Sequence, residues 1–141
     1  NKIPKVKKFT DSDNKLLNQL KNDIPNLIRL MNDQNLNEFI KIVVSYSFDA
    51  NKYFNDSEPW AVRQNDPERM KVILFAICEQ IKNISILLNP IIPVATDKVL
   101  ETMNVKKENR SINNINNLEC FDHSKELKKL DILFKKIEDD N

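Results

Sequence analysis

Glycine is absent from all 141 residues of the chain. A glycine-rich phosphate loop and a dinucleotide-binding fingerprint both need backbone that approaches phosphate without an intervening side chain, so both are excluded. The absence also disfavours an all-β fold, because the tight turns of β-hairpins prefer glycine. Helices that end at asparagine are the natural alternative, since asparagine tolerates the left-handed backbone found there.

Cysteine and histidine are scarce as well. Cys78 and Cys120 are far apart and form no Cys-x-x-Cys motif, and His123 is the single histidine. A structural zinc site needs about four such ligands, so neither a metal site nor histidine-based catalysis is expected. Cys78 falls among apolar residues at helical spacing, which predicts a buried, reduced thiol. The sequence offers no catalytic residue.

Long apolar runs and an excess of one charge are also missing. Without about 18 consecutive apolar residues no membrane-spanning helix is expected, and the N-terminus lacks the apolar core of a signal peptide. The 22 basic and 21 acidic residues give a net charge of +1. That composition argues against DNA binding through charge, but a protein that stacks a few unpaired RNA bases needs no large charge. The size fits one soluble domain, and a first residue of Asn rather than Met suggests a piece of a longer protein.

Apolar residues recur at spacings of three and four, which predicts an all-α bundle over residues 13–104. The first helix should follow capping residues at 11–13, and Pro25 should kink or divide it. A second helix is expected from Leu36 to Phe54. The predicted inward positions of these two helices are Leu16, Leu17, Leu20, Ile24, Leu27, Ile28, Met31, Leu36, Phe39, Ile40, Val43, Val44, Ser47 and Ala50.

Proline marks the next two helices. Asp66 and Pro67 are a cap and a first helical residue, which predicts a helix from about Glu68 to Leu88. A fourth helix is expected from Pro93 through Met103. The predicted inward positions are Met70, Ile73, Leu74, Ile77, Cys78, Ile81, Ile84, Leu88, Val94, Ala95, Val99, Leu100 and Met103.

Three segments outside the helices are less regular. Residues 1–12 are predicted to be a basic lead-in whose lysines (Lys5, Lys7 and Lys8) fray in solvent. Residues 105–123 contain the polar stretch SINNINN, which predicts a loop that forms core poorly. Residues 124–141 carry an apolar series that should pack back on the bundle, namely Leu127, Leu130, Leu133, Phe134 and Ile137.

The stretch DANKYFNDSEPW places the single tryptophan, Trp60, directly after Pro59 in a polar turn. Proline fixes its own backbone and biases the preceding residue away from helix, so the ring follows a stiffened corner. There it either closes a core between helices or lies ready to stack on a flat ligand. The residues alone leave both interpretations open. Tyr53, at the end of a packed helix, is predicted to be structural with a satisfied hydroxyl.

The stretches ANKYFNDSEPW, KVILFAICEQIKNISILLNPIIP and VATDKVLETMN together resemble the helical anticodon-binding domain of class Ia aminoacyl-tRNA synthetases. The family pattern is a helix ending in Asn-x-Tyr, an acidic turn, Pro-Trp, and a later helix that closes on Leu-x-Pro before another proline. Within the family the chain is most similar to the methionyl-tRNA synthetases, whose Leu-Phe-x-x-Ile-Glu close resembles DILFKKIE. The matching positions are Asn51, Tyr53, Pro59, Trp60, Leu88, Pro90 and Pro93.

The resemblance implies a domain that binds the CAU anticodon loop of tRNA and stacks Trp60 on the wobble cytosine. The parent would be a cytoplasmic ligase that uses ATP and Mg to activate methionine in a separate catalytic domain of the same chain. Neither a His-x-Gly-His nor a Lys-Met-Ser-Lys-Ser motif occurs here, so this segment is expected to bind no cofactor and to be inactive alone. In the family, an Asn and an Arg on a preceding helix also read the anticodon, and that helix is not in the sequence.

Under this resemblance the candidate RNA-binding residues surround the Pro-Trp pair. Trp60 with Pro59 is the main candidate, because stacking on an aromatic ring contributes about 1–3 kcal/mol per base. Lys52 and Arg63 flank the turn and are candidates for phosphate contacts. Asn51 is expected at an inward position, where it either caps the neighbouring turn or reads a base.

Two alternatives stay open at this point. One is the anticodon domain of a class Ia synthetase specific for isoleucine, valine, leucine or cysteine. The other is a helical protein–protein interaction domain whose groove accepts a partner helix. A bundle that lacks one helix of its family also exposes a stripe of its core, which predicts self-association at high concentration.

Overall fold

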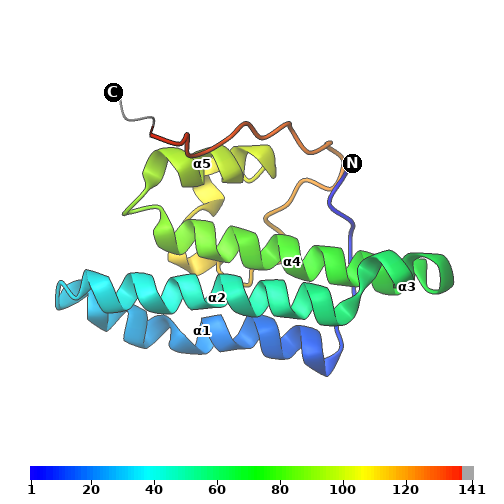
Figure 1. Ribbon diagram of the computed structural model, residues 1–141, viewed down its shortest axis with the longest axis horizontal. Coiled ribbons are helices and arrows are strands. Elements are labelled where there is room, and N and C mark those ends of the chain that lie inside the picture. Colours follow the sequence, from blue (N-terminus) through cyan, green and yellow to red (C-terminus); the bar gives the residue numbers. More distant parts are fainter. Residues whose placement is uncertain (138–141) are drawn as a thin grey trace.

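The computed structural model describes residues 1–137, where five α-helices and two 3₁₀ turns form an all-α bundle (Figure 1). The predicted fold class is confirmed. Within that range the only sheet-like pairing is one bridge between Lys2 and Glu126, and no helix is long and apolar enough to cross a membrane. The elements are α1 (Asp11–Asn32), α2 (Leu36–Ser57), α3 (Pro59–Asn65), α4 (Pro67–Leu88), α5 (Pro93–Thr102), η1 (Lys107–Asn109) and η2 (Ile112–Asn114).

The three long helices α1, α2 and α4 pack against one another, and α5 packs on α4. The short helix α3 extends past the end of this bundle and packs on α4, at the right of Figure 1. Fully buried side chains from all the longer helices meet in one core, including Leu20, Tyr46, Phe75 and Leu100. The short helix α3 thus projects from one end of a closely packed bundle.

The start of α1 differs from the prediction. Its cap is Thr10 rather than a residue at 11–13, and the Thr10 and Asp13 side chains each accept from the other's backbone N–H. This capping box satisfies donors that the first helical turn leaves unpaired. The helix also continues through Pro25, so the predicted division is wrong. Pro25 is exposed, and the buried Leu20 and Leu27 on either side hold the helix against the core.

The predicted polar turn between residues 55 and 59 is a single residue. Helix α2 runs to Ser57, and Glu58 has a left-handed backbone with φ 43° before Pro59 opens α3. Proline disfavours the right-handed helical conformation in the residue before it, which ends α2 at this point. By contrast, Asp66 caps α4 with Pro67 in its first turn, and Pro93 opens α5, as predicted.

Some predicted inward positions are wrong. Within residues 1–137 no element covers the outer side of α2 and α4, and so Val44 and Ile81 there remain open to solvent. Cys78 is a free thiol on α4, and burial raises its pKa to about 11. The predicted inward residues that are exposed are Ile28, Leu36, Val44, Ile81 and Val94.

The segment 105–123 is irregular, as predicted, but the expectation that it forms core poorly is wrong. Ile115, Cys120 and Phe121 are buried and belong to the main core. The Phe75 and Phe121 rings pack edge to face, with their centroids 5.7 Å apart. The segment therefore covers one side of α4 in the way that another helix would.

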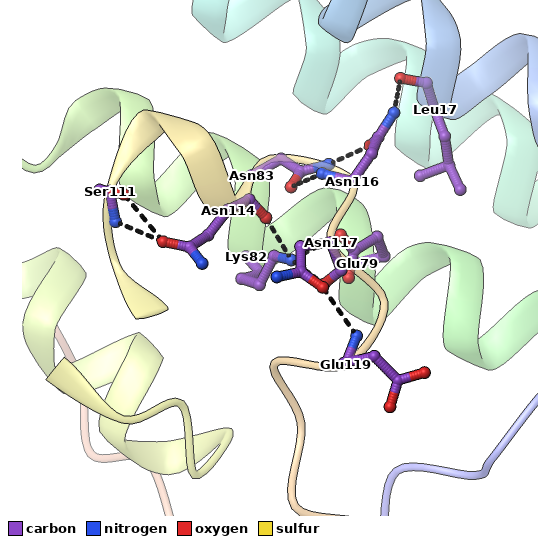
Figure 2. Close-up of polar contacts among 9 residues, drawn as sticks. All are labelled: Leu17, Glu79, Lys82, Asn83, Ser111, Asn114, Asn116, Asn117 and Glu119. Carbon is purple, nitrogen blue, oxygen red and sulfur yellow. Dashed lines mark hydrogen bonds and ion pairs between the residues drawn. The ribbon is translucent and has the colours of Figure 1, made fainter. Parts of the chain in front are cut away.

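Asparagines of this segment surround a buried ammonium group (Figure 2). Lys82 Nζ donates to Glu79 Oε1 at 2.6 Å and to the backbone carbonyls of Asn114 and Asn117, each at 2.9 Å. Both charged side chains are fully buried. Burial raises the pKa of Glu79 to about 7, although Lys82 opposes the change. Because an ammonium has three donors, the buried Lys82 is completely satisfied.

A second set of bonds fixes the same segment to the bundle (Figure 2). Asn83 and Asn116 exchange two hydrogen bonds, from Asn83 Nδ2 to Asn116 Oδ1 at 2.8 Å and from the Asn116 backbone N–H to Asn83 Oδ1 at 3.2 Å. Asn116 Nδ2 also donates to the Leu17 carbonyl at 2.9 Å. The polar stretch SINNINN thus links α4 to α1 through its asparagines.

The last described segment, 124–137, follows the bundle through its backbone. The Leu127 N–H donates to the Asn1 carbonyl at 2.7 Å, and the Lys128 N–H donates to the Thr102 carbonyl at 3.1 Å. Four members of the predicted series are nevertheless exposed, namely Leu127, Leu130, Phe134 and Ile137. The apolar packing predicted for this series is therefore not formed over much of its length, and residues 138–141 lie outside the described residues.

Candidate nucleic-acid interface

Trp60 lies in the first turn of α3, at the end of the bundle. Pro59 before it is buried, whereas the Trp60 side chain is 56% exposed. The Phe54 ring meets Trp60 edge to face, at 5.8 Å between centroids and 65° between planes. Such an edge contact supports an aromatic ring from one side. Trp60 is therefore not an anchor closed inside the core, and it presents aromatic surface to solvent.

A buried carboxylate holds together the start of α1, the end of α2 and the start of α4. Asp13 on α1 accepts from the Tyr53 hydroxyl at 2.6 Å, and it accepts two bonds from the Arg69 guanidinium at 2.7 and 2.9 Å. The Thr10 backbone N–H supplies a fourth donor at 2.9 Å. The structural role predicted for Tyr53 is confirmed. The end of α2 and the start of α4, between which α3 is inserted, are thus tied to one point.

The ionisation of Asp13 follows from these contacts. Burial on its own would raise the pKa of this carboxyl, but hydrogen bonds from Arg69, Tyr53 and Thr10 outweigh burial and lower the pKa to about 2. Burial and the neighbouring Asp13 raise the pKa of the Tyr53 hydroxyl. Charge-assisted, two-pronged pairs of this kind are among the stronger polar contacts in proteins.

We expect acid to remove the stabilisation that Asp13 provides. Its folded pKa of about 2 lies below the ordinary 3.8, so the contribution is complete above pH 4 and disappears as the pH falls towards 2. The expected loss is about 2 kcal/mol of unfolding free energy. Urea unfolding at pH 6, 4, 3 and 2 measures it. Asp13→Asn is the control, and an equally steep decline in that variant would contradict the assignment.

Asn51 and Phe54 line an apolar groove between α2 and α4, of about 310 Å³. Asn51 is exposed rather than inward, and its side chain makes no hydrogen bond within residues 1–137. Phe54 borders the groove and also contacts Trp60. The structure therefore brings Asn51 and Trp60 to the same side of the molecule, with Phe54 between them. The other lining residues are Ser47, Ala50, Ile77, Ile81 and Ile84.

Lys52 and Arg63 have different positions. Lys52 forms an exposed ion pair with Asp56 at 2.7 Å and borders a separate hollow towards α1, with Lys15 and Gln19. It therefore lies on another side of α2 from Asn51, and the structure does not bring it to Trp60. Arg63 follows Trp60 by three residues on α3, so the two side chains are surface neighbours on one helix. Arg63 is exposed and forms no ion pair in the described part of the chain.

Three residues of this site were not singled out by the sequence. Phe54 had a signal, because it follows Asn51 by three residues and precedes the Pro-Trp pair. Asp13 was predicted only as a helix cap, and its pairing with Arg69 had no signal, since 56 positions separate the two. Within residues 1–137 no group of three or more His, Cys, Asp or Glu side chains is placed to hold a metal ion.

The uncovered side of α2 and α4 bears on the state of the isolated domain. Val44 and Phe48 on α2 and Ile81 on α4 are exposed beside the groove, and Phe48 is 68% exposed. We expect two copies to bury this face against each other at high concentration. Light scattering tests this: Phe48→Ser with Ile81→Ser should give a monomer, whereas Val94→Ser, exposed on α5, should not. If the unsubstituted domain is a monomer at high concentration, the prediction is wrong.

Solved structures share this fold. The apo form of Mycobacterium tuberculosis methionyl-tRNA synthetase superposes with a TM-score of 0.85 over 97% of this chain and 28% of its own, at 21% identity. The same enzyme bound by methionyl-adenylate gives 0.76 over 82% of this chain and 24% of its own, at 24% identity. At these identities the likeness shows the fold, which is that of a helical domain of an aminoacyl-tRNA synthetase.

Sequence comparison identifies the family. The family model described as the anticodon binding domain of methionyl tRNA ligase matches residues 3–141. The chain belongs to this family, which confirms the predicted resemblance.

Three individual relatives that match the chain carry the name methionine–tRNA ligase. Methionine–tRNA ligase of Brucella suis biovar 1 is 30% identical over 109 residues, 77% of this chain and 21% of the relative. That of Methanococcus vannielii is 29% identical over 140 residues, 98% of this chain and 19% of the relative. The probable cytoplasmic methionine–tRNA ligase of Dictyostelium discoideum is 33% identical over 104 residues, 74% of this chain and 14% of the relative. The chain thus spans about a fifth or less of the length of these curated relatives.

Proposed function

We propose that this domain binds the anticodon loop of a tRNA with the anticodon CAU, and that Trp60 stacks on the wobble cytosine. The observation that carries the proposal is an exposed tryptophan on a rigid corner, in a chain of the anticodon-binding family. Loop bases are unpaired, so a protein can splay them out and receive them on an aromatic face. Pro59 and Phe54 hold the ring in place while aromatic surface remains free.

The neighbouring residues take supporting roles in this proposal. Arg63, beside Trp60 on α3, supplies a cation to a loop phosphate. Asn51 borders the groove next to Phe54, where its amide offers both a donor and acceptors to a base edge. Lys52 is the weakest of the predicted contacts, because Asp56 already pairs with it and it faces another side of α2.

We further propose that the longer protein is a cytoplasmic methionine–tRNA ligase. Its catalytic domain, in the same chain, would bind ATP and Mg and form the methionyl-adenylate. The ligase relatives support this, as do the cytoplasmic relative and the M. tuberculosis enzyme bound by methionyl-adenylate. The domain described here is expected to contribute RNA binding and no aminoacylation of its own.

The single tryptophan supplies the test. Trp60 fluorescence is titrated with an RNA hairpin that bears a CAU loop, and again with uracil in place of the wobble cytosine. Strong quenching by the first and little by the second supports both the stacking and the methionine specificity. Equal quenching by both contradicts the wobble-cytosine assignment and favours another class Ia synthetase. Absence of quenching together with absence of RNA binding contradicts the proposal and favours the protein–protein interaction domain.

A further inference from the structure

The lead-in before α1 is not frayed, contrary to the prediction. Ile3 is only 4% exposed, and Val6 and Phe9 pack against the core. The Phe9 ring meets Phe75 at 5.9 Å between centroids, and His123 Nδ1 lies 3.0 Å from the Ile3 carbonyl oxygen. The backbone of the lead-in is therefore held on the bundle at several points.

Anchoring this segment fixes the direction of its lysines. Ile3, Val6 and Phe9, each three residues apart, face the core, whereas Lys5, Lys7 and Lys8 are exposed. All three lysines line the same hollow in the surface, so they lie close to one another. We call Lys5, Lys7 and Lys8 the lysine ridge.

The lysine ridge borders the first turns of α4, across a hollow of about 590 Å³. Two basic groups on the opposite wall are already paired, since Arg69 pairs with Asp13 and Lys71 pairs with Glu68 at 2.6 Å. The Asp66 carboxylate accepts only from the neutral Arg69 backbone N–H and is one negative charge against the three lysines. No ion pair involves the three ridge lysines within residues 1–137. They form a local excess of positive charge in a chain whose net charge is +1.

The position of the ridge relates it to Trp60. In Figure 1 the lead-in descends past the place where α3 and α4 meet, at the end of the bundle from which α3 projects. An RNA loop held at Trp60 would bring its flanking backbone to this end. An anchored backbone suits phosphate binding, because only the lysine side chains, and not the segment that carries them, then lose conformational freedom.

We propose that the lysine ridge binds backbone phosphates of the RNA strand that flanks the anticodon loop. This inference rests on the proposed function, since Trp60 sets where the RNA lies. Contacts to phosphate position a nucleic acid and carry no base information. The ridge therefore strengthens binding of any hairpin at this site and leaves the choice of the wobble base to Trp60 and its neighbours.

The test compares Lys5→Gln/Lys7→Gln/Lys8→Gln with a control triple, Lys98→Gln/Lys106→Gln/Lys107→Gln, in the full 141-residue chain. The control lysines are exposed on α5 and around η1. Circular dichroism confirms the fold of each variant. Anisotropy of labelled CAU hairpin, measured over a series of KCl concentrations, gives the dependence of log K on log salt. Each lost single-strand phosphate contact lowers this slope by about 0.7.

We expect the ridge triple to flatten the slope by about 2, three times the value for one contact, and the control triple to leave it unchanged. Trp60 quenching at saturation and the preference for cytosine over uracil should be the same in both. If the Lys5/Lys7/Lys8 variant has the same salt slope as the control variant, the inference is overturned. This holds even if the unsubstituted domain shows Trp60 quenching and prefers cytosine over uracil. The unsubstituted domain could instead bind RNA without Trp60 quenching and without preferring cytosine. If the Lys5/Lys7/Lys8 variant still flattens the slope in that case, the lysine ridge is supported and the role of Trp60 is contradicted.

Discussion

Replacing Lys82 with methionine is expected to destabilise the domain by about 3–5 kcal/mol, because it leaves Glu79 buried without its partner. Two carbonyls of the polar segment, those of Asn114 and Asn117, lose the same donor. Removing one member of a buried ion pair costs far more than the pair itself contributes. Chemical unfolding monitored by circular dichroism measures the change.

Two matched variants separate this effect from a general loss of charge. Lys71→Met removes an exposed lysine that pairs with Glu68 at the same three-residue spacing on α4, and it should cost less than about 1 kcal/mol. Lys82→Met with Glu79→Leu should recover part of the loss, since no buried carboxylate then lacks a partner. Equal stabilities of the Lys82 and Lys71 variants would show that the buried pair is not needed.

Replacing Trp60 with alanine is expected to weaken binding of a CAU hairpin by about 5- to 150-fold. This range corresponds to the roughly 1–3 kcal/mol that aromatic stacking contributes per base. Stability should change little, because more than half of the side chain is in solvent. Anisotropy of labelled RNA measures the affinity, since the variant has no tryptophan to report on.

Phe134→Ala is the matched control for this experiment. Phe134 is also an exposed aromatic, in the segment 124–137, but it has no place in the proposed RNA-binding site, so its removal should leave the affinity within about twofold. Trp60→Phe should retain part of the affinity, because a smaller ring still stacks. An unchanged affinity in Trp60→Ala, or an equal loss in Phe134→Ala, would exclude stacking on Trp60 as the source of binding.

The features predicted well from the sequence are those that depend on neighbouring residues. Asp66 with Pro67 marked the start of α4, and Pro93 marked the start of α5, because capping and the fixed backbone of proline act within one turn. The apolar spacing identified the helices for the same reason. It misjudged Val44 and Ile81, since periodicity shows which side of a helix is apolar and not whether another element covers it.

The contacts that span the chain could not be predicted in this way. Lys82 reaches carbonyls that are 32 and 35 positions further along, and a lysine in a helix carries no sign of such partners. The asparagines of SINNINN gave a loop signal by composition, but their contacts with Lys82 and Asn83 depend on the tertiary structure. The lead-in was misjudged similarly, because Phe9 is held by Phe75 and not by its neighbours in sequence.

The candidate site also combines features that neighbouring residues predict with features that depend on tertiary packing. Pro59 and Trp60 were found from their order in the sequence, which already implies a stiff corner. Asn51 and Lys52 are adjacent in sequence and were both included in the candidate site, yet successive helical residues point about 100° apart. One consequently borders the groove that leads to Trp60, and the other pairs with Asp56 towards α1. Only the packing of α2 between its neighbours distinguishes them.

The asparagine segment also determines where this domain can be cut. A chain ended at Asn104, after the last predicted helix, would keep Lys82 and Glu79 on α4 but would remove the carbonyls and the aromatic ring that enclose them. Water would then reach a charged pair in the middle of the core. The shortest autonomous folding unit therefore extends at least to Phe121, and an expression boundary placed by helix content alone would yield an unstable product.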